Sequence, residues 1–163
     1  QEEITRVGEA KEVAYRRLVR ERGIDLLPGV RRWLDRLRAE GWQQAVASSA
    51  PRANLEVIIE ALRLEDYFAA VASAEDVTEG KPDPQVFLVA AGKLGVGPAS
   101  CVVVEDAPAG TEAARRAGMR CVGVLSSHGE LEADIVVRTL EELPETAFDD
   151  LLAAGYTGQN RPR

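Results

Sequence analysis

The stretch Cys101-Val102-Val103-Val104-Glu105-Asp106 decides the fold. Its four apolar residues, three of them β-branched, predict a short strand that is buried on both faces, as strands of parallel sheets are. The segment from Pro108 to Ala117 has small side chains at helical spacing and predicts a helix that lies close to the sheet. Residues 119–125 then predict another strand. A strand, a helix and a strand of these lengths form the right-handed unit from which parallel sheets are built.

The same alternation continues on both sides of this unit. Apolar runs bounded by glycine, proline or serine predict the strands, and apolar residues recurring every three or four positions predict the helices. The further strands are expected at residues 44–47, 68–72 and 134–137, and the further helices at residues 3–22, 30–40, 51–62, 84–94 and 140–152. The expected fold class is therefore α/β, with a doubly wound parallel sheet.

Composition excludes several classes of function. The 163 residues suit one domain, and 45% apolar with 29% charged residues is ordinary for a globular chain. No apolar run approaches the roughly 18 residues that span a bilayer, and the acidic start Gln1-Glu2-Glu3 does not resemble a secretory signal, so we expect a cytoplasmic location and no membrane partner. The net charge of −7 disfavours nucleic acid as a partner, because binding it needs basic surface.

Several residues of reactive types are expected to serve packing instead of chemistry. Cys101 and Cys121 each open an apolar run, which favours buried free thiols over a disulfide or a metal pair. Trp33 and Trp42 flank the end of one helix and predict packing in the core or at its rim. His128, the sole histidine, lies in a loop where we expect it to be solvated, and we assign it no role.

Polar side chains stand where the predicted strands end. Ser48 follows one strand, Glu105 and Asp106 end another, and Lys81 lies in a loop. Ligands of open α/β sheets bind beyond the carboxyl ends of the strands. A hydroxyl and an ammonium bind phosphate oxygens, and adjacent carboxylates suit a hard cation such as Mg²⁺ that cancels their repulsion. The set predicts a phosphate site with Mg²⁺, while helix capping by Ser48 and a helix-dipole role for Asp106 are the alternatives.

Five short segments place these residues in a longer pattern. In chain order they are Leu27-Pro28-Gly29-Val30, Ala47-Ser48-Ser49, Gly80-Lys81-Pro82-Asp83-Pro84, Glu105-Asp106-Ala107-Pro108-Ala109-Gly110 and Ala117-Gly118-Met119. The pattern resembles the haloacid dehalogenase superfamily, and within it the β-phosphoglucomutase-like phosphatases with a helical cap. The similarity covers roughly residues 11–143, which is most of the chain.

The resemblance implies a reaction and a set of roles. The reaction is Mg²⁺-dependent phosphoryl transfer by a phosphatase or phosphomutase, from a small phosphate monoester such as a sugar phosphate, through an aspartyl-phosphate. Ser48 would bind the transferring phosphoryl group and Lys81 would neutralise phosphate and nucleophile. Glu105 and Asp106 would hold Mg²⁺. The substrate contacts implied are Ser49 and, on the first helix, Lys11.

The resemblance also implies a division of the chain into parts. Residues 1–26 would be a remnant of the helical cap, and residues 27–154 would form the α/β core of the haloacid dehalogenase type without its first strand. Residues 155–163 are expected to form a disordered tail.

One element of the family pattern has no counterpart in this sequence. The family's first motif, an Asp-x-Asp on the central strand, is absent, and that strand would lie between the strands ending at Ser48 and Glu105. Two buried sheet edges then carry unpaired N–H and C=O groups, each costing about 1 to 3 kcal/mol. We expect the chain to be inactive alone. Either the two neighbouring strands pair with each other, or another chain or a segment preceding Gln1 supplies the strand.

Two other functions share part of this pattern. A phosphoacceptor receiver domain combines acids, a hydroxyl and a lysine on a doubly wound sheet, but its acids come first and its lysine last. Here the order is hydroxyl, lysine and acids. A non-catalytic module of the same fold would keep the phosphate and metal contacts without turnover.

Overall fold

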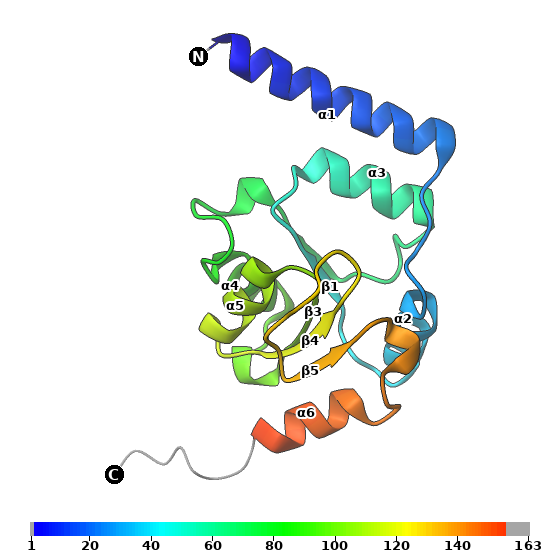
Figure 1. Ribbon diagram of the computed structural model, residues 1–163, viewed down its shortest axis with the longest axis vertical. Coiled ribbons are helices and arrows are strands. Elements are labelled where there is room, and N and C mark those ends of the chain that lie inside the picture. The colour runs from blue at the N-terminus through cyan, green and yellow to red at the C-terminus, as the bar shows by residue number, and fades with distance from the viewer. Residues whose placement is uncertain (1, 156–163) are drawn as a thin grey trace.

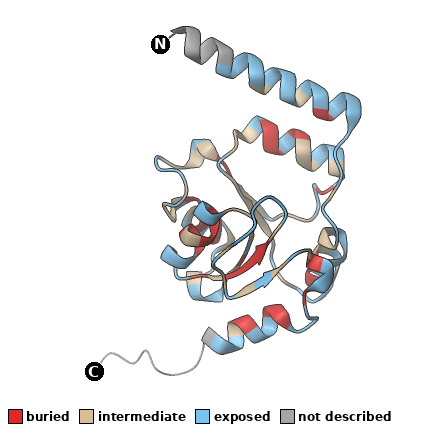
Figure 2. Cartoon of the chain, in the orientation of Figure 1, coloured by how far each residue is buried: buried red, intermediate tan, exposed pale blue. Residues whose placement is uncertain are grey.

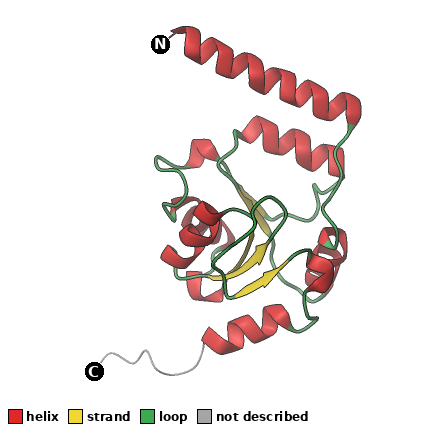
Figure 3. Cartoon of the chain, in the orientation of Figure 1, coloured by secondary structure: helices red, strands yellow, loops and turns green. Residues whose placement is uncertain are grey.

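The computed structural model describes residues 2–155, with side chains from Gly8 to Ala154. Strands and helices alternate between residues 45 and 124 of this part of the chain (Figures 1 and 3). The helices are α1 (Glu2–Arg22), α2 (Val30–Ala39), α3 (Arg52–Leu62), α4 (Gln85–Leu94), α5 (Pro108–Arg116) and α6 (Ala147–Gly155), with 3-10 turns η1 (Ala74–Asp76), η2 (Pro98–Ser100) and η3 (Leu140–Glu142). The strands are β1 (Ala45–Ala47), β2 (Ala70–Ala72), β3 (Val102–Glu105), β4 (Arg120–Val124) and β5 (Ile135–Val137).

The elements confirm the expected α/β fold, and each predicted strand is present within a few residues of its expected ends. The last predicted helical stretch is divided into η3 and α6. Gly155 ends α6, and residues 156–163 of the expected tail lie outside the described residues. None of the helices in the described part is long and apolar enough to cross a bilayer.

The strands form two parallel sheets. β1 pairs with β2, with Val46 beside Val71. The second sheet has the order β3-β4-β5, with Val103 beside Cys121. Within residues 2–155, no ladder of hydrogen bonds joins β1 to β3. The expected alternative in which β1 and β3 pair directly with each other is therefore not observed in this structure.

Two hydrophobic clusters cover opposite faces of the strands. Helices α4 and α5 pack on the face that includes Val103 and Cys121, whereas α2 and α6 pack on the face that includes Val122 and Val124 (Figure 2). Successive residues of β4 thus enter different clusters, as expected for a strand covered on both sides. This arrangement confirms the doubly wound architecture.

The residues expected to serve packing do so. Trp33 is 3% exposed, and its ring centroid lies 5.1 Å from that of Phe148, while Trp42 lies 5.8 Å from the same ring. Both cysteines are free thiols; Cys121 is buried and Cys101 half-buried. Burial raises the pKa of the Cys121 thiol to about 12, which keeps it protonated and unreactive near neutral pH.

The prediction that β3 is buried on both faces is wrong at Val104. This side chain is 43% exposed, whereas Val103 on the opposite face is 9% exposed. Val102 shares the face of Val104 and packs against the second cluster, so the cover is lost only near the carboxyl end of the strand. The exposure has two causes: the edge of β3 that faces β1 is not paired with another strand, and a cavity lies at the carboxyl end of β3.

Helix α1 lies alongside α3, apart from the sheets (Figure 1). The buried amide of Asn54 joins them, because Arg16 Nη1 donates to its Oδ1 at 2.9 Å and its Nδ2 donates to Glu12. Most of the described surface of α1 is exposed, including Val13 and Leu18 (Figure 2). That residues 1–26 are a remnant of a cap stays a prediction.

Candidate functional site

A cavity of about 540 Å³ opens at the carboxyl ends of β1, β3 and β4. Its lining combines an apolar floor with polar groups from several loops. The lining residues are Leu27, Pro28, Val30, Ala47, Ser48, Lys81, Val104, Glu105, Asp106, Val124, Ser126, Arg138, Thr139 and Leu140. Four residues singled out in the sequence, separated by up to 58 positions from Ser48 to Asp106, therefore meet at one cavity.

Lys81 and Glu105 form an ion pair in the wall of this cavity. Lys81 Nζ donates to Glu105 Oε2 at 2.7 Å, and the two side chains are only 17% and 9% exposed. The ammonium also lies 5.5 Å from the ring centroid of Phe87. Glu105 Oε1 accepts the backbone N–H groups of Asp106 at 3.0 Å and Ala107 at 3.3 Å. Glu105 is thus held at both oxygens, and it fixes the lysine at the cavity.

Gly110 on α5 makes room for this ion pair. A Cβ atom at this position would lie 2.0 Å from Glu105 Cδ and 2.2 Å from Oε2. Any other residue at position 110 would therefore force the carboxylate away from Lys81. The close approach of α5 to β3, which the small residues of this helix predict, is needed to form the site.

We expect Gly110→Ala to break the Lys81–Glu105 contact while the fold persists, since the flexible carboxylate can move aside. The matched control is Gly92→Ala, because a Cβ atom there meets nothing within 4 Å and alanine favours a helix by about 1 kcal/mol. Binding of inorganic phosphate, followed by calorimetry, should weaken about tenfold or more in the first variant only. Equal phosphate affinity in both variants would contradict this account.

The carboxylate of Asp106 accepts hydrogen bonds from serine hydroxyls. Its Oδ2 accepts hydrogen bonds from the hydroxyls of Ser127 at 2.9 Å and Ser126 at 3.2 Å. Partial burial raises the pKa of Asp106, but the hydrogen bonds to its carboxylate, led by that of Ser127, outweigh burial and hold the pKa below its ordinary value. The carboxylates of Asp106 and Glu105 thus accept hydrogen bonds from different protein donors, hydroxyls in the first case and Lys81 with two backbone N–H groups in the second.

Ser48 does not cap the helix that follows it. Helix α3 begins at Arg52 and its cap residue is Pro51, while the N–H of Arg52 donates to the carboxylate of Glu75 and not to Ser48. Ser48 Oγ instead accepts the N–H of Ala50 at 3.1 Å, and the Ser48 N–H donates to Ala72 O at 3.0 Å. Because the hydroxyl oxygen accepts the bond from Ala50, its hydrogen is able to donate into the cavity.

Ser49 and Lys11 differ from the other predicted site residues. Both are exposed, and neither belongs to the described lining of the cavity. Lys11 lies on α1, which packs on α3. Their contact with substrate stays a prediction.

Sequence reasoning missed residues from two later loops. Ser126 and Arg138 line the cavity, and Ser127 and His128 contact Asp106. All four come after a strand, Ser126, Ser127 and His128 after β4 and Arg138 after β5, so the rule that located Ser48 could have found them. His128 is exposed, as expected, but its ring contacts the site.

The residues present fit a magnesium site in which the protein supplies only part of the ligands, and water and phosphate oxygens supply the rest. No group of three histidine, cysteine, aspartate or glutamate residues able to hold a metal ion occurs in the described part of the chain. Mg²⁺ commonly takes one or two carboxylates and completes its shell with water and phosphate oxygens. Asp106, whose Oδ2 is held by hydroxyls rather than by a cation, suits that arrangement, whereas Glu105 already faces Lys81.

Comparison with known proteins identifies the family. Residues 2–118 match the sequence model of the hydrolases described as haloacid dehalogenase-like hydrolase. The chain belongs to this family. Both the family and the α/β fold expected from the sequence are thereby confirmed, and the receiver-domain alternative is wrong.

The chain is similar to phosphatases and phosphomutases of the family. It is 43% identical over 119 residues to the β-phosphoglucomutase of Bacillus subtilis (73% of this chain and 52% of the relative), and 38% identical over 129 residues to hexitol phosphatase B of Escherichia coli K12 (78% and 58%). The chain thus spans about half the length of the curated relatives it matches.

Solved structures support the same assignment. The crystal structure of CbbY from Rhodobacter sphaeroides in complex with phosphate superposes with a TM-score of 0.84 at 28% identity, covering 90% of this chain and 68% of that one. The β-phosphoglucomutase of Clostridium difficile gives a TM-score of 0.82 at 30% identity, covering 94% and 69%.

Proposed function

We propose that this chain forms the phosphate- and magnesium-binding part of a phosphatase or phosphomutase that acts on a small phosphate monoester, such as a sugar phosphate. The convergence of Ser48, Lys81 and Asp106 on one cavity carries the proposal. Relatives named β-phosphoglucomutase and hexitol phosphatase support this substrate class. Neither nucleic acid nor membrane is a proposed partner, and a cytoplasmic location, where phosphorylated metabolites occur, is part of the proposal.

The chain's own residues would bind and orient the phosphate. Phosphoryl transfer depends mainly on positioning and on compensation of charge at the phosphate oxygens. Lys81 places an ammonium at the cavity, and the Ser48 hydroxyl supplies a donor from the neighbouring strand end. Glu105 keeps the lysine in position through the 2.7 Å ion pair. Mg²⁺ bound at Asp106 would supply further positive charge opposite the phosphate oxygens.

We further propose that an extended segment fills the gap between β1 and β3. The exposed side chains of Val104 and Leu27 line the same cavity as the polar residues, so a strand there would bury apolar side chains and pair two free edges. An aspartate at its carboxyl end would lie beside Ser48 and Asp106 and act as the nucleophile that forms the aspartyl-phosphate. A segment preceding Gln1 or another chain would donate this strand.

The chain alone is expected to release no phosphate from p-nitrophenyl phosphate. Adding a synthetic peptide with an apolar run followed by Asp-x-Asp is expected to produce Mg²⁺-dependent release, because it supplies both the strand and the nucleophile. A peptide with asparagine in place of both aspartates is the matched control and should bind without turnover. Release of phosphate by the chain alone, lost in Lys81→Met, would show that a nucleophile is already present.

A second candidate is a binding module without turnover. It is favoured by the lining of the cavity, in which Asp106 is the sole aspartate among the described residues. Calorimetry with Mg²⁺ and inorganic phosphate would then show binding that Asp106→Ala removes, and no peptide would restore hydrolysis.

A further inference from the structure

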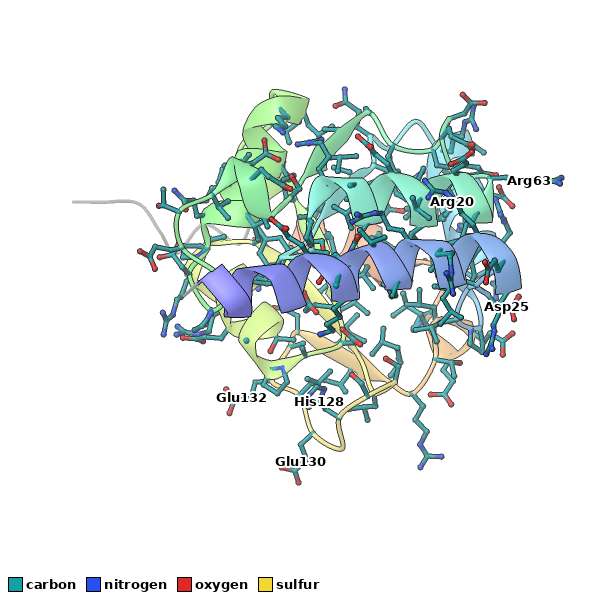
Figure 4. All side chains as sticks on the ribbon, turned by 90° about the horizontal axis from the view of Figure 1, so that it is seen from above. Arg20, Asp25, Arg63, His128, Glu130 and Glu132 are labelled. Atoms are coloured by element: carbon teal, nitrogen blue, oxygen red, sulfur yellow. The ribbon has the colours of Figure 1, made fainter. Side chains whose placement is uncertain are left out.

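We propose that Ser127 and His128 are positioning residues that hold Asp106 in the orientation needed to bind Mg²⁺. This inference rests on the proposed function, in which Asp106 is a ligand of Mg²⁺. The two residues lie on the loop between β4 and β5. Figure 4 shows this loop, with Glu130 directed away from the molecule and His128 closer to it.

This loop contacts the carboxylate and the backbone carbonyl of Asp106. Ser127 Oγ lies 2.9 Å from the carboxylate Oδ2, and Ser126 Oγ lies 3.2 Å from the same atom. His128 Nδ1 lies 3.1 Å from the backbone carbonyl oxygen of Asp106, and Ser127 Oγ lies 3.3 Å from it. Consecutive residues thus fix the side chain and the peptide group of one aspartate.

The contact between His128 and the Asp106 carbonyl is a hydrogen bond in the tautomer that carries its hydrogen on Nδ1. The carbonyl oxygen of Asp106 can only accept, so Nδ1 must be the donor at 3.1 Å. Ser127 uses its single hydrogen toward the carboxylate, so its oxygen, 3.0 Å from Nδ1, can accept only by sharing the one Nδ1 hydrogen with that carbonyl in a bifurcated hydrogen bond. Donors then run in one direction, from His128 through Ser127 to Asp106.

The ends of the loop are anchored independently of Asp106. At its start, the N–H of Leu125 donates to Val137 O at 2.9 Å. Near its end, Asp134 Oδ2 accepts the N–H of Cys121 at 2.8 Å and Oδ1 accepts from Arg120 at 2.8 Å. No helix joins β4 to β5 in the described part of the chain (Figure 3), and the exposed residues 126–128 lie between these two anchored ends.

Removing the side chain of Ser127 or His128 is expected to change the affinity for metal much more than the stability of the fold. Ser127 and His128 are exposed, so water replaces a lost hydrogen bond and the change in folding stability is small. Metal affinity responds more strongly, because groups that orient a ligand typically affect it by about 10- to 100-fold. Oδ1 is left for the ion when Oδ2 is occupied by the two hydroxyls.

The test compares paired variants of the 163-residue chain. Ser127→Ala and His128→Ala are expected to weaken Mg²⁺ binding about tenfold by calorimetry, with an unchanged melting temperature. Ser127→Thr keeps the hydroxyl, and His128→Asn keeps a donor near the position of Nδ1, so both should restore the affinity. Without metal, NMR couplings of Asp106 should change from one side-chain rotamer to an average in the alanine variants. Ser100→Ala, at the opposite end of β3, is the neutral control.

Asp106→Asn separates this proposal from the proposed function. If Asp106→Asn abolishes Mg²⁺ binding but the alanine variants bind like the parent and keep one rotamer, the positioning role is wrong. If Asp106→Asn leaves Mg²⁺ binding unchanged, the assignment of Asp106 as a ligand is wrong, and the metal-free NMR comparison still decides whether the loop holds this side chain.

Discussion

Lys81→Met is expected to lower the free energy of unfolding by about 3 kcal/mol, since it leaves the carboxylate of Glu105 without its cation in a nearly buried position. Inorganic phosphate binding should weaken at least tenfold in the same variant, because Lys81 is the one ammonium in the described lining of the cavity and only the exposed Arg138 remains there as a cation. Urea denaturation measures the first effect and calorimetry the second.

Two further variants test the cause of this loss. Lys93→Met removes one of the two cations that contact Asp76, the other being Arg52, and should cost much less than Lys81→Met because the lysine is 35% exposed. Adding Glu105→Leu to Lys81→Met removes the uncompensated charge and should restore part of the stability but none of the phosphate binding. An unfolding midpoint for Lys81→Met equal to the parent's would show that the ion pair does not persist in solution.

Gly29→Ala is expected to destabilise the chain by a similar amount, about 3 kcal/mol, through two additive causes. The residue has φ of 83°, which costs a non-glycine residue about 1 to 2 kcal/mol. A Cβ atom would also lie 2.6 Å from Glu141 N and 2.7 Å from Leu140 C, and relieving such an overlap costs about 1 to 3 kcal/mol. Since Pro28, Val30 and Leu140 line the cavity, the displacement reaches the site.

Gly41→Ala is the matched control for this substitution. Gly41 has φ of 84°, but a Cβ atom there meets nothing within 4 Å, so only the backbone cost of about 1 to 2 kcal/mol applies. The difference between the two variants in thermal and urea denaturation isolates the contact with η3. If both variants lose the same stability, the close approach of Gly29 to Leu140 is not tight in solution.

Much of the site was predictable because apolar runs locate the strands, and ligands of parallel sheets bind at the carboxyl ends of the strands. Each strand was visible as an apolar run, and parallel strands present their carboxyl ends at the same edge. Ser48 and Asp106 could therefore be placed together without any contact being known. The same rule applied to Ser126 and Ser127, but serines in a loop are common and carried no distinguishing signal.

The partners of each charged group could not be predicted. That Glu105 and Asp106 both hold Mg²⁺ stays a prediction. The structure shows their protein partners, Lys81 for Glu105 and the hydroxyls after β4 for Asp106, two arrangements that the sequence did not indicate. Nothing in the order of residues distinguishes these arrangements, because Lys81 lies 24 positions from Glu105 and Ser127 lies 21 from Asp106. Which side chains meet depends on how closely α5 and the loops approach β3.

The sequence by itself determined the alternation of strands and helices, the parallel sheet and the edge at which its polar residues gather, since these follow from hydrophobic periodicity and from the handedness of β-α-β units. Only the tertiary structure decided that β1 and β3 stay apart, that Val104 is exposed, and that Gly110 leaves space for the Glu105 carboxylate. The physical reason is that these features depend on ångström-scale distances between segments remote in the chain, which packing fixes and local residue patterns do not encode.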